Sequence, residues 1–424
     1  MAKNNIIVGL DIGTTKVRAV IAERSPQGCF SITGVGQSPC TGLRKGAVVN
    51  IEATLRSISE AVEAAELMSG QVADSCWTGI NGSHTEGVIS RGVVAVNGRN
   101  RAHREISKDD LERVLEAARA VDFSMDRDIL EVIPQTYIVD SQSGIRDPLH
   151  MIGVRLESEV LIITCSTTSA QNLVKCVNRA GFRVNDLVLQ TLAAGRAVLT
   201  EEEKEMGVAL IDLGGGTSNI LIYNQGVPCF TASAPVGGAQ VTSDISIVKN
   251  ITPETAEKIK VESGCCWEPL LDDADETVIV PGTGGRAPFP IPRSLILDII
   301  KPRMTEIFQL LKAKIEEHCK LRTLAGGIVL SGGGANLPGA ADLAAEVFNV
   351  PVRIGNPLPV GGLVDDYRNP AYATAVGLVL EGNERLGGSA TFPGSQEAAP
   401  AHSGGQNPFS VFAKLGQWFK REFF

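Results

Sequence analysis

The hydrophobic and polar positions of this 424-residue chain repeat one short pattern twice. An apolar run at 6–8 precedes the stretch from Asp11 to Lys16 (DIGTTK), and a second apolar run follows at 17–21. Later, an apolar run at 208–211 precedes Asp212 to Thr217 (DLGGGT), and another follows at 220–223. Short apolar runs on both sides of a glycine-rich turn are typical of two strands joined by a hairpin. We therefore expect two similar β-hairpins in separate halves of the chain.

Helical periodicity accounts for much of the rest. Ser107, with Asp109 and Asp110 in the turn that follows it, is a typical helix start. The spacing of apolar residues predicts helices at 53–67, 107–120, 169–199 (with one strand near Val188), 253–262, 295–318 and 370–380. It predicts strands at 129–139 and 160–165, short strands near Val88 and at 93–96, a loose hairpin at 268–292, and a buried strand from Ile328 that ends in a glycine turn.

The two hairpin bends carry the residue types of an anion site. Glycines allow backbone N–H groups to converge on an anion, and threonine hydroxyls add donors. An aspartate at the end of each first strand could hold the water shell of a metal ion between the bends. A third turn, Gly332 to Gly334 with Asn336, has no side chains that would block a flat ring. Each bend by itself could instead be ordinary turn chemistry, with the aspartate as a cap.

Composition narrows the possible functions. The net charge is −9 and no stretch is rich in Lys and Arg, which argues against nucleic acid as a partner. Nine cysteines without a Cys-x-x-Cys pair favour reduced thiols, and five scattered histidines do not support a histidine metal site or a catalytic triad. The N-terminus lacks a signal-peptide layout and no apolar run approaches the ~20 residues of a spanning helix. We expect a cytoplasmic protein.

The last segment of the chain differs from the rest. Residues 387–407 are rich in Gly, Ser, Ala and Pro and are expected to be a flexible linker. At 100° per residue, the apolar side chains at 408–424 occupy one half of a helix and the basic ones the other, which is typical of an interfacial membrane anchor. A helix that docks on its own body or in a partner's groove is the alternative. The residues concerned are Phe409, Phe412, Leu415, Trp418, Phe419 and Phe423 on the apolar half, and Lys414, Lys420 and Arg421 on the basic half.

The order of phosphate hairpin, connecting helix, second hairpin, adenosine turn and connecting helix is similar to that of the actin, Hsp70 and sugar-kinase superfamily. Within it, the chain resembles the FtsA family of bacterial cell-division proteins over nearly its full length. The stretches that carry this resemblance include 241–245 (VTSDI), 256–260 (AEKIK), and Pro302 and Arg303 with Glu306. The implied fold class is α/β, an actin-like duplicated ribonuclease-H-type ATPase fold with an FtsA-type α+β inserted subdomain.

The resemblance also implies domain boundaries. Residues 1–82 would form domain 1A with the first hairpin, 83–168 the inserted subdomain 1C, and 169–205 the remainder of 1A with a connecting helix. Residues 206–386 would form domain 2, with its outer part 2B at about 250–320. The linker at 387–407 and the amphipathic helix at 408–424 would follow.

The cofactors implied by the resemblance are ATP and Mg²⁺. Asp11 and Asp212 would face the magnesium ion through its waters, and Gln190 would orient the attacking water. Gln190 as a packing residue, and Glu257 with Lys260 as a solvated helix pair, are the open alternatives. The resemblance further implies that Glu257 and Lys260 reach the ribose and base edge, that Gly333 and Gly334 line the adenine, and that the phosphates are contacted by Thr14, Thr15, Lys16, Gly214, Gly215, Gly216 and Thr217. Gly13, Gly238, Gly332 and Asn336 complete the implied nucleotide-binding residues.

One residue departs from the superfamily pattern. Many members carry an acid two residues after the threonine of the second hairpin, whereas this chain has Asn219. An amide can bond a metal-bound water but cannot polarise it as a carboxylate does. We therefore expect at most a slow ATPase, in which the nucleotide acts mainly as a conformational switch.

By resemblance, the function would be structural. The protein would polymerise on the cytoplasmic side of the inner membrane, as a peripheral protein bound to lipids at the division septum, and tether the tubulin-like protein FtsZ there. Arg303 and Glu306 would contact FtsZ, and the inserted subdomain would serve self-assembly and contacts with other division proteins. The alternatives are an assembly platform of the pilus PilM type and a small-molecule kinase, for which the sequence offers no identifiable catalytic aspartate. An Hsp70-like chaperone would need a peptide-binding domain after the ATPase.

Overall fold

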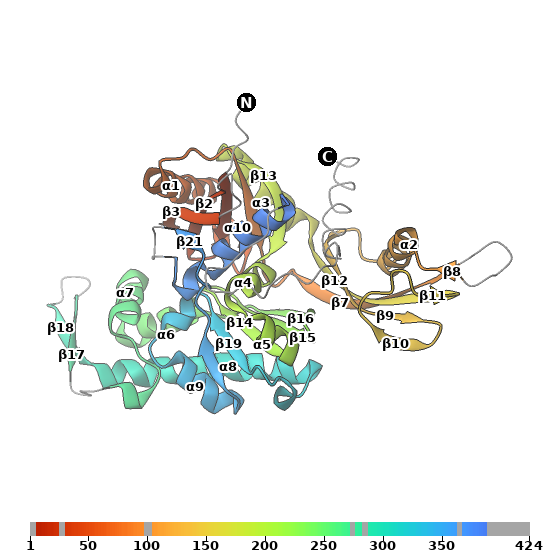
Figure 1. Ribbon diagram of the computed structural model, residues 1–424. Helices are drawn as coiled ribbons and strands as arrows, with labels where there is room; N and C mark the ends of the chain where they lie inside the picture. Colours follow the sequence, from red (N-terminus) through yellow and green to blue (C-terminus); the bar gives the residue numbers. More distant parts are fainter. Residues whose placement is uncertain are drawn as a thin grey trace.

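Three β-sheets organise the chain into two lobes and a projecting subdomain (Figure 1). The computed structural model describes residues 6–24, 30–96, 104–271, 276–281, 287–362 and 367–387. In the first lobe the sheet order is β13-β6-β1-β2-β3-β21. Its strands are β1 (Ile6–Ile12), β2 (Lys16–Arg24), β3 (Phe30–Pro39), β6 (Ser75–Ile80), β13 (Arg183–Leu189) and β21 (Gly361–Gly362), and a small hairpin adds β4 (Leu43–Arg44) and β5 (Ala47–Val48).

Alternation along β1 divides the first lobe into two packed faces. Val8 and Leu10 belong to the cluster that includes α1 (Ile51–Ser69) and α3 (Thr167–Arg179). Ile7 points the other way, into the cluster of α4 (Gln190–Val198) and α10 (Ala373–Arg385). This period of two is what a central strand covered on both sides requires.

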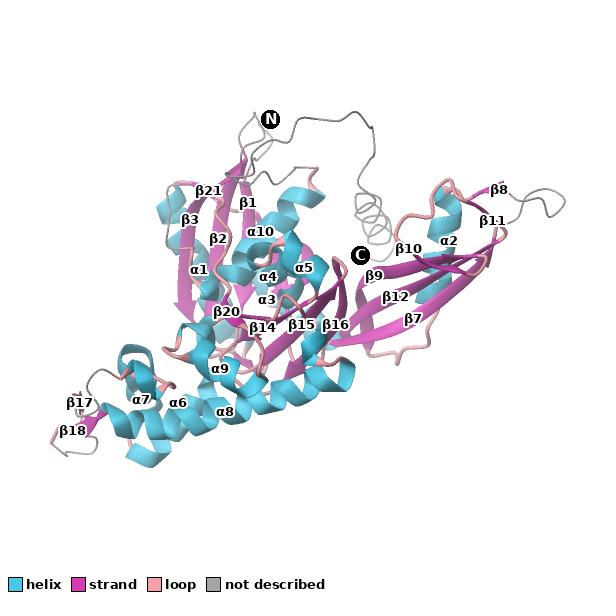
Figure 2. Cartoon of the chain, turned by 60° about the horizontal axis from the view of Figure 1, so that its bottom comes forward, coloured by secondary structure: helices cyan, strands magenta, loops and turns pink. Residues whose placement is uncertain are grey.

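The second lobe repeats the arrangement with the sheet order β16-β15-β14-β19-β20. Helix α8 (Arg293–His318) runs along the outside of this lobe, and the hairpin β17–β18 projects near its beginning (Figures 1 and 2). The strands are β14 (Val208–Leu213), β15 (Ser218–Asn224), β16 (Val227–Ala234), β19 (Ile328–Ser331), β20 (Val352–Ile354), β17 (Thr277–Val280) and β18 (Phe289–Pro292). The helices are α5 (Glu201–Met206), α6 (Gly238–Lys249), α7 (Pro253–Ser263), α8 and α9 (Ala340–Phe348), with short 3-10 turns η2 (Glu268–Leu270), η3 (Leu321–Thr323), η4 (Gly333–Asn336) and, leading into α10, η5 (Pro370–Tyr372).

The internal duplication expected from the sequence is present. β1 and β2 pair antiparallel with Asp11 opposite Arg18, and β14 and β15 pair antiparallel with Asp212 opposite Asn219. β1 then pairs in parallel with β6, and β14 pairs in parallel with β19. The two aspartates therefore occupy equivalent positions in the two lobes.

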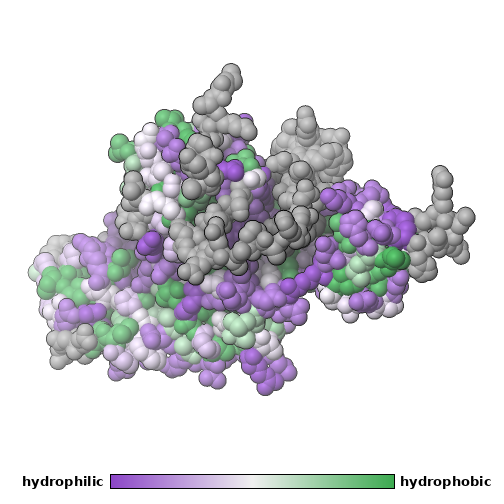
Figure 3. Space-filling view, viewed as in Figure 1, coloured by the Kyte–Doolittle hydropathy of each residue, from purple (hydrophilic) through white to green (hydrophobic). Residues whose placement is uncertain are grey.

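The inserted subdomain has a sheet and a core of its own (Figures 1 and 2). Its sheet order is β10-β9-β12-β7, and α2 packs on one face so closely that a Cβ on Gly92 would lie 2.2 Å from the carbonyl oxygen of Val114. In the view of Figure 3, apolar residues gather on this subdomain among polar ones. The elements are β7 (Glu86–Ala95), β8 (Arg104–Glu105), α2 (Lys108–Arg119), β9 (Arg127–Val139), β10 (Gln142–Ile145), β11 (Ile152–Gly153) and β12 (Arg155–Ser166).

Two expectations about these elements need correction. The short strands near Val88 and at 93–96 are one continuous strand, β7, because it pairs along ten residues with β12. Helices α6 and α9, and strand β16, were not predicted. α6 has a weak apolar face, and α9 has only nine residues, fewer than the window of about 11–18 over which helical spacing is recognised.

Helices α4 and α10 cross between the lobes and join their cores. Their axes approach so closely that a Cβ on Gly377 of α10 would lie 1.7 Å from the carbonyl oxygen of Ala193 on α4. The surrounding cluster also contains Leu210 from the second sheet and Leu161 from the inserted subdomain. This joint therefore holds all three bodies against one another.

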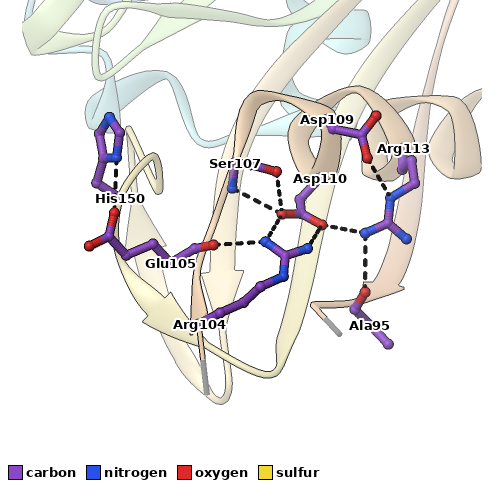
Figure 4. Close-up of polar contacts among 8 residues, drawn as sticks. All are labelled: Ala95, Arg104, Glu105, Ser107, Asp109, Asp110, Arg113 and His150. Atoms are coloured by element: carbon purple, nitrogen blue, oxygen red, sulfur yellow. Dashed lines mark hydrogen bonds and ion pairs between the residues drawn. The ribbon is translucent and has the colours of Figure 1, made fainter. Parts of the chain in front are cut away.

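A buried carboxylate organises the tip of the inserted subdomain (Figure 4). Asp110, whose side chain is fully buried, accepts a two-pronged hydrogen bond from Arg104 at 2.6 and 2.7 Å, and others from Arg113 and from the backbone and side chain of Ser107. Burial alone would raise its pKa, but these hydrogen bonds outweigh burial and hold the pKa well below its usual range. Asp110 thus caps α2 and ties it to β8.

Replacing Asp110 with Asn removes the charge that both arginines share. We expect the free energy of local opening to fall by about 2 kcal/mol, which corresponds to roughly thirtyfold faster hydrogen exchange of the α2 and β8 amides. Asp109→Asn is the matched control, since that side chain is 81% exposed. Equal exchange in the two variants would contradict a structural role for the buried carboxylate.

Candidate functional site

The hairpin bends of the two lobes and the third glycine turn meet in one cleft. Both aspartates, both bends and Gln190 line it, together with residues that the sequence did not single out. The lining residues are Asp11, Ile12, Gly13, Thr14, Thr15, Lys16, Arg18, Gly46, Asn81, Gln190, Asp212, Gly214, Gly215, Gly216, Thr217, Asn219, Gly332, Gly333, Ala371 and Thr374.

The two aspartates are buried at the base of this cleft, each only 8% exposed. Burial raises the pKa of Asp11 to about 7; Arg18 opposes this and the Asp212 carboxylate adds to it. Burial also raises the pKa of Asp212, while a hydrogen bond from Asn219 and the charge of Arg18 lower it. Two buried carboxylates whose pKa values are both raised, one of them partly by the other's charge, are stabilised by a shared cation.

Both hairpin bends are closed in the same way. The backbone N–H of Gly13 donates to the carbonyl of Lys16 at 3.0 Å, and that of Gly214 donates to the carbonyl of Thr217 at 3.0 Å. The bends also touch each other, because a Cβ on Gly215 would lie 2.3 Å from the methyl carbon of Thr15. The two bends are therefore in direct contact across the cleft.

Lys16 and Arg18 add positive charge beside the aspartates. Burial is the largest cause that lowers the pKa of Lys16, and the charge of the neighbouring Arg18 lowers it further. Arg18 lies over the ring of Tyr372, 5.5 Å from its centroid. Cations and converging backbone donors make this end of the cleft suitable for an anion with several charges.

The third glycine turn is built around the second aspartate. Gly332 has a φ of +80°, and a Cβ there would lie 2.3 Å from Asp212 Oδ1, so that only glycine fits. Gly333 lines the cleft, whereas Gly334 faces Leu213. Asn336 donates to the side chain of Asn369 at 2.8 Å, outside the set of lining residues.

Gly238, Glu257 and Lys260 form a polar cluster next to the second bend. Lys260 Nζ donates to Glu257 at 2.6 Å and to the carbonyl of Gly238 at 3.1 Å, and Gly238 N–H donates to Gly214 at 2.9 Å. Their charges also influence the pKa of Lys16 in the cleft. The helix pair expected from the sequence is thus formed and held beside the cleft through α6.

Gln190 and Asn219 are both engaged in the cleft. Gln190 Nε2 donates to Asp11 Oδ1 at 2.9 Å, which leaves its carbonyl oxygen as an acceptor. Asn219 accepts from Ser233 at 2.7 Å and donates to Thr217 at 3.4 Å. Asn219 therefore supports the second bend and presents no carboxylate to the cleft.

Arg18, Gly46, Asn81, Ala371 and Thr374 were missed by the sequence interpretation. For two of them, the sequence did contain a clue to their position in the cleft. Arg18 lies opposite Asp11 in the hairpin register, and Asn81 directly follows β6, a parallel neighbour of β1. Ligands in α/β folds gather at the carboxyl ends of such strands. Gly46, Ala371 and Thr374 reach the cleft through tertiary contacts that no local pattern indicates.

The other sequence-based sites lie elsewhere. Arg303 on α8 forms a two-pronged ion pair with Asp244 on α6, at 2.5 and 3.1 Å, and also contacts Glu306. The amphipathic segment 408–424 lies outside the described residues. Among the helices of the described ranges, none is both long and apolar enough to cross a membrane.

Replacing Asp11 with Asn tests the cost of the buried charge. The folded chain releases this proton near pH 7 and the unfolded chain near pH 3.8, so the stability of the metal-free protein falls as the pH rises between these values. Above pH 7 the penalty is about 4 kcal/mol. In urea unfolding without divalent cation, we expect Asp11→Asn to be more stable than the parent at pH 8 and similar to it near pH 4. If the stability difference between Asp11→Asn and the parent is the same at pH 8 and pH 4, the expected cost of the buried charge is wrong.

Comparisons with known proteins place this geometry in a family. The profile described as "Cell division protein FtsA" matches residues 209–377, and that described as "SHS2 domain inserted in FTSA" matches 82–164. The chain is 44% identical over 420 residues to the cell division protein FtsA of Borreliella burgdorferi, covering 99% of each protein.

Solved structures share the architecture. A PilM–PilN type IV pilus biogenesis complex matches with a TM-score of 0.62 and 18% identity, covering 89% of this chain and 98% of the other. MreB5 of Spiroplasma citri bound to AMPPNP matches with a TM-score of 0.54 and 13% identity, covering 91% and 99%. The fold is thus the actin-like ATPase fold with an SHS2 insertion, as the sequence predicted, and the chain belongs to the FtsA family of cell-division proteins.

Proposed function

We propose that this protein binds ATP with Mg²⁺ in the cleft between its lobes and uses the bound nucleotide as a conformational switch. The observation that carries the proposal is the pair of duplicated hairpins, which brings Asp11 and Asp212 together beside two sets of backbone donors. A magnesium ion carries the positive charge that two buried carboxylates require, and it prefers to keep its own waters when bound. MreB5 of Spiroplasma citri, which shares the fold, has a structure bound to AMPPNP.

The proposed roles follow from the positions of the side chains. Asp11 and Asp212 hold the water shell of the cation, while the two bends and Lys16 bind the phosphates. The cluster of Glu257, Lys260 and Gly238 faces the sugar, and Gly333 leaves space for the base. Gln190 Oε1 would accept a hydrogen bond from the attacking water and orient it, but an amide is too weak a base to take its proton. Since Asn219 is engaged in the second bend, hydrolysis is slow.

The bound nucleotide is proposed to act by changing how the two lobes are positioned. Thr15 touches Gly215 across the cleft, so the occupant of the cleft sets the separation of the two bends. α4 and α10 cross at the joint and carry any change in lobe angle to the outer parts of both lobes. A small change at the phosphates therefore alters the surfaces through which copies of the chain stack into a polymer.

Membrane attachment is proposed from the sequence of 408–424. The six apolar side chains and three basic ones named above would each contribute about 1 kcal/mol, which the ordering of the free segment largely offsets. One copy then binds a bilayer weakly, and a polymer binds it strongly through effective concentration. This combination suits a peripheral protein that tethers FtsZ to the cytoplasmic side of the membrane at the septum.

The proposed FtsZ contact is the surface of α8 around Glu306, which is 56% exposed. Arg303 is less available, because its guanidinium is held by Asp244. The inserted subdomain is proposed to contact other copies and other division proteins. Its strand β7 exposes Ile89 and Val93 by 48% and 46%, and Figure 3 shows apolar residues on this subdomain.

Two alternatives are less well supported. A small-molecule kinase needs a catalytic carboxylate with a substrate pocket, and the carboxylates that line this cleft are Asp11 and Asp212, the pair assigned to the cation. A platform of the PilM type shares the fold, but full-length identity places the chain with FtsA proteins.

Calorimetry with ATP and Mg²⁺ tests the cofactor proposal. We expect saturable binding to the parent protein that EDTA weakens strongly. Asp212→Asn should weaken binding at least about tenfold, because one of the two charges facing the cation is lost. Asp109→Asn, on the inserted subdomain, should bind like the parent. The absence of binding heat in the parent would refute the proposal.

Flotation of FtsZ with anionic vesicles tests the tethering role. The parent should float and carry FtsZ with it, and removal of 408–424 should abolish flotation of both. Glu306→Arg should float without FtsZ. Asp244→Asn is the control, because it weakens the ion pair with Arg303 and leaves the Glu306 carboxylate in place, and it should retain FtsZ. If the Glu306 variant carries FtsZ as well as the parent does, the proposed surface is wrong.

A further inference from the structure

Asn81 stands in the cleft with a donor that it does not use. It directly follows β6, which lies between β1 and β13 in the first sheet. All three strands run parallel, so Asn81 emerges at the same edge as the first bend after β1 and Gln190 after β13. Asn81 lines the cleft and is only 6% exposed.

The amide of Asn81 has a fixed orientation. Its Oδ1 accepts the backbone N–H of Gly82 at 2.8 Å, and the hydroxyl of Thr85 lies 3.1 Å from the same oxygen. Because a backbone N–H can only donate, the oxygen of the amide must be on this side. Nδ2 is therefore turned away from Gly82. It is buried and has no hydrogen-bond partner among the residues that the structure describes.

An unused donor in a buried position is costly, and the other amides of the cleft do not share this property. Gln190 uses its Nε2 on Asp11, and Asn219 uses its nitrogen on Thr217. A buried polar atom without a partner costs about 1–3 kcal/mol. Such an atom on the wall of a cleft indicates a ligand acceptor.

The neighbours of Asn81 indicate which acceptor this is. Gly46 packs over its carbonyl oxygen and donates its backbone N–H to Thr14 of the first bend at 3.3 Å. The Cγ of Gln190 occupies the space above Gly79 of β6, two residues before Asn81. Asn81 therefore lies between a bend suited to phosphates and the residue proposed to orient the attacking water.

We propose that Asn81 Nδ2 donates a hydrogen bond to the terminal phosphoryl group of a nucleoside triphosphate, and thereby distinguishes a triphosphate from a diphosphate. This inference rests on the proposed function, since it assumes that the cleft holds a nucleotide. A diphosphate lacks the terminal oxygens and leaves the donor unpaired, so its binding gains nothing from Asn81.

The same residue connects the phosphate to the inserted subdomain. Oδ1 of Asn81 holds Gly82 and Thr85, immediately before β7 begins. In the same turn, the carbonyl oxygen of His84 accepts a hydrogen bond from Arg127 of β9 at 3.3 Å. Arg127 also donates to the hydroxyl of Thr164 on β12 at 2.7 Å. The amide of Asn81 therefore connects a ligand at Nδ2 with the turn at 82–85, from which the inserted subdomain begins. A bound triphosphate would reduce the mobility of this turn.

Binding constants for AMPPNP and ADP, each with Mg²⁺, test the inference. Asn81→Asp keeps the acceptor for Gly82 and Thr85 but replaces the donor with a second oxygen. We expect the preference for AMPPNP over ADP to fall about tenfold or more, because a charge-assisted hydrogen bond is lost only for the triphosphate. Asn81→Ser, which is neutral and too short to reach, should shift the preference in the same direction.

Thr191→Val is the matched control. Thr191 also has a buried side-chain oxygen without a partner and adjoins Gln190, but it does not line the cleft. This variant should keep the parent's preference. Thermal midpoints of all variants without nucleotide establish that they fold.

The second readout is hydrogen exchange at residues 82–95. In the parent, AMPPNP should slow exchange there more than ADP does, and Asn81→Asp should remove the difference. If the parent binds neither nucleotide, the proposed function fails. If the parent binds both and the Asn81 variants weaken both equally, or weaken neither, the function stands and the assignment of Asn81 is wrong.

Discussion

Two buried carboxylates that face one another across the joint of the lobes determine how the rest of the molecule is built. Asp11 and Asp212 each have a raised pKa, because burial disfavours their charge. Arg18 relieves part of this cost from within the chain. The remainder favours a cation that both lobes share. Since each lobe supplies one carboxylate, the proposed switch couples the charge balance of the cleft to the angle between the lobes.

That coupling needs a joint that transmits movement. The crossing of α4 and α10 is close because Gly377 has no side chain, and its core includes side chains from both lobes and the inserted subdomain. Packed interfaces of this kind change between discrete arrangements and do not deform continuously. The inserted subdomain adds a second connection to the cleft, through Asn81 and the turn that precedes β7. The structure thus offers two routes from the cleft to surfaces that other proteins could contact.

Much of the fold and of the candidate site was predictable from local patterns. The hairpin bends, the helix start at Ser107 and the cluster of Glu257 with Lys260 have short-range causes: glycine conformations, capping and i,i+3 spacing. Helix α6 was missed because its apolar face is weak, and β7 was divided in two because its polar residues interrupt the pattern. Arg18 and Asn81 were missed although each occupies a position next to a recognised strand end.

The sequence by itself determined the duplicated hairpins, the inserted subdomain and the family, since these depend on residue order and on conformations that neighbours in the chain impose. Only the tertiary structure decided which side chains share the cleft. It showed that Gly334 and Asn336 are not among the residues that line the cleft, that Arg303 is engaged by Asp244, and that Asn81 has a donor without a partner among the described residues. The physical reason is that burial and hydrogen-bond satisfaction depend on every group that packs around an atom, and most of those groups are distant in sequence.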